Sequence, residues 1–129
     1  MVWKSVISGQ FTSAASPGTT YYSEVQNWGL QVKDLIGDLV LSGVGVAGTT
    51  LTVAVAIWGG PTPDVNTMAL VASMTATPVT TTSATFPFSK AMDVIPDMNH
   101  PYFRAVLTIV SATSNNSVKL ELFLGGKPY

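Results

Sequence analysis

The sequence has no cysteine, one histidine, and only six basic and seven acidic side chains, which make up 10% of the 129 residues. Without cysteine the chain has no disulfide, no thiol nucleophile and no thiolate metal ligand. A net charge of -1 with scattered basic residues gives no electrostatic footprint for nucleic acid. An average soluble domain carries about 25% charged residues, so this chain displays little charge to water.

This scarcity of charge indicates a protein that associates. The hydrophobic content of 47% excludes a disordered chain, and the length is that of one domain with a sizeable core. A freely soluble monomer usually displays more charge on its surface. We therefore expect the chain to bury much of its outside against copies of itself or against a partner protein.

The longest stretch without a charged residue spans residues 39–63. About 20 apolar residues in a helix would cross a bilayer, but Gly43, Gly45 and Gly48 interrupt this stretch and β-branched residues dominate the rest. Residues 51–58 also alternate with period 2, which is typical of a strand. The pattern predicts two strands, about 38–46 and 50–58, joined as a hairpin by a turn at 47–49, and no membrane span.

Similar alternation elsewhere predicts an all-β protein. Residues 102–111 and 118–124 alternate in the same way, and the polar residues between them predict a second hairpin. Further strands are expected within 21–30, 68–74 and 86–95. Short strands separated by regular turn signals are typical of an antiparallel β-sandwich, here jelly-roll-like with about eight strands.

The N-terminal residues 1–19 are expected to form an arm, and residues 20–129 a single β-sandwich domain. Trp3 and Phe11 are large apolar groups on a segment too thin to bury them by itself. They either fold back on the domain's own sheet or dock on a neighbouring subunit, and both alternatives stay open. The apolar run Val6-Ile7 is too short for a secretory signal.

The second face of the two strongest strands is also apolar or small. A sheet that faces water would normally carry polar residues there, so either another segment of the chain or another subunit is expected to cover it. Together with the aromatic residues of the N-terminal region, these side chains form the predicted subunit or capsid interface: Trp3, Phe11, Tyr21, Tyr22, Ala54, Ala56, Trp58, Val106 and Val110.

The sequence contains no recognisable catalytic or metal-binding motif. His100 is the only imidazole and lies in a turn, without a nucleophile elbow before a helix. Asp93, Asp97 and Asn99 depart from the spacing of a calcium loop. We therefore expect no catalytic residue, no cofactor and no metal site.

Arg104 is the only arginine, and it lies within an apolar strand. A guanidinium in such surroundings needs hydrogen-bond acceptors or a carboxylate. Asp38 or Asp34, near the start of the first predicted hairpin, would supply one in a structural ion pair. The alternative is a contact between Arg104 and a partner chain.

The order of elements resembles the small β-sandwich structural proteins of tailed bacteriophages, the capsid decoration (cement) and head-fibre proteins. The resemblance spans about residues 35–125 and is carried by three features: an apolar strand, a Gly-Thr turn and an alternating strand over 38–57, the Gly/Pro/Asp loop at 59–64, and the run Pro101-Tyr102-Phe103-Arg104-Ala105-Val106-Leu107. It implies a non-enzymatic virion protein on the outer capsid surface, which assembles as a trimer and clamps neighbouring major capsid subunits.

Two other classes of function remain open from the sequence. A carbohydrate- or receptor-binding module of a phage fibre or tail would expose Trp58, Tyr21 or Tyr22 in a groove at the loop end, where aromatic rings stack on sugars. An enzyme would need a cleft that contains His100 with acidic residues around it.

Overall fold

The computed structural model describes residues 2–27, 32–45, 50–80, 88–95, 100–111 and 116–128. In this part of the chain most residues lie in β-strands, and one short 3-10 helix, η1 (Val65–Thr67), interrupts the loop after β5. The all-β antiparallel sandwich is thus confirmed. The strands are β1 (Val2–Thr12), β2 (Thr19–Tyr22), β3 (Gln26–Asn27), β4 (Val32–Val44), β5 (Thr50–Gly60), β6 (Ala69–Thr80), β7 (Phe88–Ile95), β8 (Tyr102–Ser111) and β9 (Ser117–Pro128).

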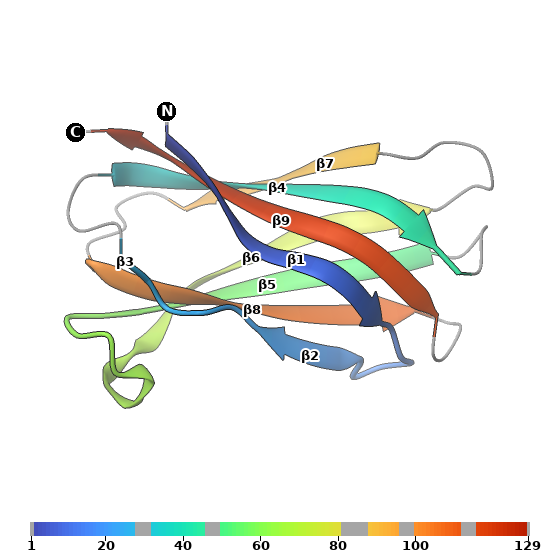
Figure 1. Ribbon diagram of the computed structural model, residues 1–129, viewed down its shortest axis with the longest axis horizontal. Coiled ribbons are helices and arrows are strands. Elements are labelled where there is room, and N and C mark those ends of the chain that lie inside the picture. The colour runs from blue at the N-terminus through green and yellow to red at the C-terminus, as the bar shows by residue number, and fades with distance from the viewer. Residues whose placement is uncertain are drawn as a thin grey trace.

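The strands form two sheets with the topology of a jelly roll (Figure 1). One sheet has four strands in the order β1-β9-β4-β7, and the other has β2-β8-β5-β6, with β3 pairing with β8 as its fifth strand. The first strand lies beside the last, β2 beside β8, β4 beside β7, and β5 beside β6, all antiparallel. This is the pattern of one long hairpin rolled into a two-sheet sandwich.

The prediction that consecutive strands pair as two hairpins is wrong, although the strands themselves are confirmed. β4 and β5 follow each other in the chain but belong to different sheets, and so do β8 and β9. Each of these strands has one strongly apolar face, and two such faces are buried equally well when the strands oppose each other across the sandwich. The predicted turn at 47–49 and residues 112–115 lie outside the described residues.

The core lies between the two sheets and is built by the predicted alternation. In β5 and β8 every odd-numbered side chain from Leu51 to Ile57 and from Phe103 to Ile109 is buried, whereas the even-numbered ones are only half-buried. The other sheet contributes Leu35, Leu39, Leu41, Val118, Leu120, Leu122 and Leu124, together with Val6 and Ile7.

The strand part of the expected N-terminal arm belongs to the sandwich itself. β1 pairs with β9 over its whole length, from Val2 opposite Gly126 to Thr12 opposite Ser117. The two ends of the chain consequently lie close together in Figure 1. This pairing gives backbone hydrogen-bond partners to an edge of β9 that would otherwise be open. The backbone of this segment folds back on the domain's own sheet, while docking of Trp3 on a neighbouring subunit stays a prediction.

The turn before β2 requires glycine at position 18. Gly18 has φ +88°, and a Cβ added there would lie 2.6 Å from the carbonyl oxygen of Ile109 and 2.7 Å from Cγ2 of Val110. A left-handed conformation and a clash with the backbone of β8 both oppose a side chain at this position.

We expect Gly18→Ala to lower the free energy of unfolding by about 2 kcal/mol, because it combines backbone strain with displacement of the turn from β8. Urea denaturation measures the change. Gly43→Ala is the matched control, since a Cβ at Gly43 meets no atom within 4 Å. Equal stabilities of the two variants would contradict this account of Gly18.

The charge-free stretch at 39–63 forms the end of β4, the whole of β5 and the start of the loop that follows it. Among the described residues no helix is long and apolar enough to cross a membrane. The predicted strands of this stretch are confirmed for the residues that the structure describes.

Candidate functional site

The outward side of the five-stranded sheet carries most of the predicted interface. Because the odd-numbered side chains of β5 and β8 fill the core, the even-numbered ones point away from it. The antiparallel register places Ala54 opposite Thr108, Ala56 opposite Val106, and Trp58 opposite Arg104. Together with Tyr22 and Leu70 from the flanking strands, these side chains form what we call the outer face: Tyr22, Ala54, Ala56, Trp58, Leu70, Arg104, Val106 and Thr108.

Tyr22 and Leu70 extend the outer face to both sides. Tyr22 of β2 lies opposite Val106 and is 62% exposed, and Leu70 of β6 lies opposite Trp58 and is 53% exposed. Large apolar side chains this exposed are typical of an interaction surface when they adjoin other apolar groups. Leu70 is absent from the predicted interface, because its place beside Trp58 depends on a register shift between Ile57 and Trp58 that no sequence period reveals.

The outward side of the other sheet is more polar along β1 and β9. Ser5 donates a hydrogen bond to the carboxylate of Glu121, and Lys119 is exposed. Trp3 lies on this side, 46% exposed, with its indole ring directly over Gly125. Trp3 is thus partly accessible, but it is on the opposite side of the sandwich from Trp58.

Phe11 and Tyr21 point inward instead of toward a subunit interface. Their registers place Phe11 opposite the buried Val118 and Tyr21 opposite the buried Leu107. The two rings meet edge to face, with centroids 4.7 Å apart, and pack against the core. The hydroxyl of Tyr21 also accepts a hydrogen bond of 3.0 Å from the backbone N–H of Thr12. These two aromatic groups close the sandwich where the chain passes from β1 to β2.

Val110 is covered in part by the chain itself. Ala14 forms a bridge with Val110, the N–H of Ser111 donates to the carbonyl oxygen of Ala14 at 2.9 Å, and Gly18 lies against the Val110 side chain. The predicted interface therefore loses Val110 at this end. Its remaining members on the five-stranded sheet are Tyr22, Ala54, Ala56, Trp58 and Val106.

The predicted ion pair between Arg104 and Asp38 does not form. Arg104 points outward from the five-stranded sheet, whereas Asp38 lies on β4 of the other sheet, opposite the outward-pointing Phe123. The outward sides of the two sheets lie on opposite sides of the core, so these charges cannot meet. Asp34, the second predicted partner, pairs instead with Lys127, with 3.6 Å between the Asp34 Oδ2 and Lys127 Nζ.

Arg104 is held by an aromatic ring. Its Cζ lies 4.9 Å from the centroid of the Tyr22 ring, the geometry of a cation–π contact. Its Nε is buried and donates to no acceptor in the described part of the chain. A buried donor without an acceptor costs free energy, so the outer face contains one charged group with an unused hydrogen bond.

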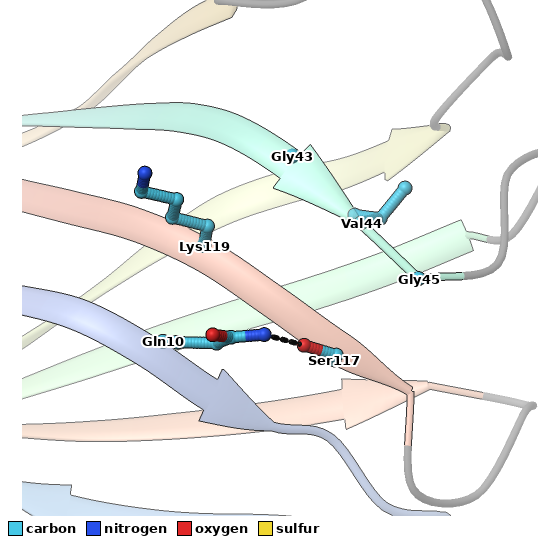
Figure 2. A pocket seen from close by; sticks show the side chains of 6 residues that line it. All are labelled: Gln10, Gly43, Val44, Gly45, Ser117 and Lys119. Carbon is cyan, nitrogen blue, oxygen red and sulfur yellow. Dashed lines mark hydrogen bonds between the residues drawn. The ribbon is translucent and has the colours of Figure 1, made fainter.

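A small open hollow lies at the other end of the sandwich from Trp58, where β4 ends and β9 begins (Figure 2). Its volume is about 260 Å³, below the roughly 300–1,000 Å³ of most small-molecule sites. The amide of Gln10 donates a hydrogen bond to Ser117 Oγ, and Lys119 is the one ionisable side chain among the described residues that line the hollow. These described residues provide no pair of titratable groups for acid–base chemistry. It is lined by Gln10, Gly43, Val44, Gly45, Ser117 and Lys119.

His100 has a packing role in the structure. A Cβ added at Gly59 would lie 3.0 Å from both Cβ and Cδ2 of His100, so the half-buried imidazole covers the backbone of β5 near its end. In the described part of the chain no three His, Cys, Asp or Glu side chains gather to hold a metal ion. The side chains of Asp93, Asp97 and Asn99 lie outside the described residues.

No family model matches the chain, and no curated protein sequence matches it. Solved structures do match, at sequence identities of 13–16%. The structure of the infectious bursal disease virus Gt strain matches with a TM-score of 0.57 over 95% of this chain, and the VP2 subviral particle of that virus with 0.59 over 95%. Its T=1 particles match with 0.58 over 98%.

The comparisons define a class of fold. The chain shares its β-sandwich fold with chains of these structures of infectious bursal disease virus and its particles. The chain spans 32% of the length of these neighbours, and at this identity the likeness concerns the fold alone. The narrower resemblance to decoration proteins of tailed bacteriophages stays a prediction.

Proposed function

We propose that this chain is a non-enzymatic structural component of a virus particle. The observation that carries the proposal is the outer face: a jelly roll of the capsid type presents adjoining apolar rows on one sheet, with Arg104 as the charged side chain among them. The capsid proteins with the same fold support this role. His100 packs on Gly59 without a described acidic cluster around it, which gives no support to an enzyme.

Within that role, the chain is a decoration (cement) protein on the outer capsid surface. It self-associates, with a trimer as the favoured assembly, and binds the major capsid protein, but not nucleic acid or a membrane. Burying the outer face would contribute about 25 cal/mol for each Å² of apolar surface removed from water. Lasting interfaces of this kind commonly bury about 2,000 Å² or more in total. The exposed Trp3, on the opposite side of the sandwich, would add a second contact, with the capsid.

Self-association is tested by light scattering on the purified chain over a wide range of concentrations. A trimer would have three times the monomer mass of 13.5 kDa. The cement role is tested separately, by sedimenting the chain with assembled capsids that lack it. A stable monomer at every concentration would contradict self-association, and failure to sediment with capsids would contradict the cement role.

A receptor-binding role remains a second candidate because of Tyr22. Its ring is largely exposed on the same face as the half-buried Trp58, and exposed aromatic rings are the usual platform for a sugar. A glycan array with the wild type and with Tyr22→Ala separates the two candidates. Binding of a glycan that Tyr22→Ala abolishes would favour the receptor-binding module of a fibre or tail over the cement protein.

A further inference from the structure

The outer face holds a cation with an unused donor. Arg104 is flanked by Trp58 on β5 and by the Tyr22 ring, and its buried Nε has no acceptor among the described residues. The guanidinium has the planar fork that binds a carboxylate through two parallel hydrogen bonds. No carboxylate in the described part of the chain forms an ion pair with it. A carboxylate of another chain would give this guanidinium the partner that it lacks among the described residues.

An exposed carboxylate lies at the border of the same face. Ser23 follows β2 and is fixed to β8, since its N–H donates to the carbonyl oxygen of Ala105 at 2.9 Å and its hydroxyl accepts from the Ala105 N–H at 2.8 Å. Glu24, the next residue, is exposed, and its carboxylate forms no hydrogen bond or ion pair with a described residue. The outer face thus combines apolar rows with one cation on them and one free anion at their edge.

We propose that the outer face docks against the outer face of a second copy of this chain, with the Glu24 carboxylate of one copy bound by Arg104 of the other. The inference rests on the proposed self-association and names its contact. It is argued from charge complementarity: each copy offers both members of the pair, and the apolar rows around them exclude water. In a two-fold contact the pair forms twice, and in a ring once at each interface.

The test exchanges the charges in separate chains. Arg104→Glu leaves two acids at the contact and Glu24→Arg leaves two cations, so each variant alone should self-associate at least about tenfold more weakly than the wild type. In a mixture of the two variants, the acid introduced at position 104 of one chain faces the base introduced at position 24 of the other. The native Glu24 of the first chain likewise faces the native Arg104 of the second. We expect tagged Arg104→Glu to capture Glu24→Arg at least about tenfold better than it captures untagged copies of itself.

The mixing experiment separates a contact between copies from a pair within one chain, because mixing cannot restore a pair inside a chain. If only the double variant carrying both substitutions recovers, the pair is within one chain and the inference is overturned. It is also overturned if both single variants associate like the wild type, while self-association itself then stands. A wild type that is monomeric throughout refutes the proposed self-association and, with it, this contact.

Two further variants control for charge and folding. Lys119→Glu makes the same change of charge on the other sheet and should leave self-association unchanged. Thermal melts establish that each variant is folded. Should Arg104→Glu fail to fold, Arg104→Lys keeps the charge and loses Nε and the fork; weaker self-association of this variant supports the contact, and unchanged self-association overturns it.

Discussion

Replacing Leu107 by alanine is expected to lower the free energy of unfolding by about 3 kcal/mol, the usual cost of a Leu→Ala cavity in a packed core. Leu107 is fully buried on β8, between Val55 of β5 and the core-facing Tyr21 of β2. Both neighbours are fixed in a β ladder, so they cannot move far to fill the space. Chemical denaturation followed by tryptophan fluorescence measures the loss.

Thr108→Ala is the matched control for this prediction. Thr108 is the next residue on β8, but it points outward and lies opposite Ala54. Its truncation should change stability by no more than about 0.5 kcal/mol, as is usual for surface substitutions. Comparable losses for the two variants would show that the inward and outward sides of β8 are assigned incorrectly.

The second large effect is expected from Ala56→Glu, which should weaken self-association by about a hundredfold or more. Ala56 lies near the centre of the outer face, between Val106 on β8 and Ser73 on β6. A carboxylate there would have to leave water without a partner when the face is buried, which costs several kcal/mol. In the monomer the same side chain can still reach water, so the fold should be retained.

Sedimentation of Ala56→Glu across a concentration series measures this loss, and circular dichroism verifies the fold. Thr12→Glu introduces the same charge at an exposed position on β1 of the other sheet and should associate like the wild type. If Ala56→Glu associates normally and Thr12→Glu does not, the subunit contact lies on the side of Trp3 instead. That result would remove the outer face from the proposed function without affecting the fold.

The two outward sides of the sandwich differ in chemistry, and the proposed function uses each for a different contact. A cement protein must hold neighbours together, and one sheet offers apolar rows with a cation while the other offers Trp3 among polar groups. The low charge of the chain is consistent with this arrangement, since surface that is buried in an assembly does not have to keep the chain soluble. The outer face would serve association between copies, and the side of Trp3 the capsid.

The sequence determined that β5 and β8 are strands and which side of each enters the core. Alternation over 51–57 and 103–109 has a period of two, and a strand with that period can bury its apolar side in one way only. The same alternation shows that the other side of these strands is mostly apolar or small, which predicts Ala54, Ala56 and Val106 of the outer face but not Leu70.

Only the tertiary structure decided which strands pair and which charges can meet. β4 and β5, predicted as a hairpin, belong to different sheets, because the backbone hydrogen bonds of a ladder are the same for any two strands and leave no local mark in the sequence. That choice of sheet places Arg104 and Asp38 on opposite sides of the core. It also brings Tyr22 and Ser23 alongside β8, so that Glu24 lies at the border of the face that carries Arg104.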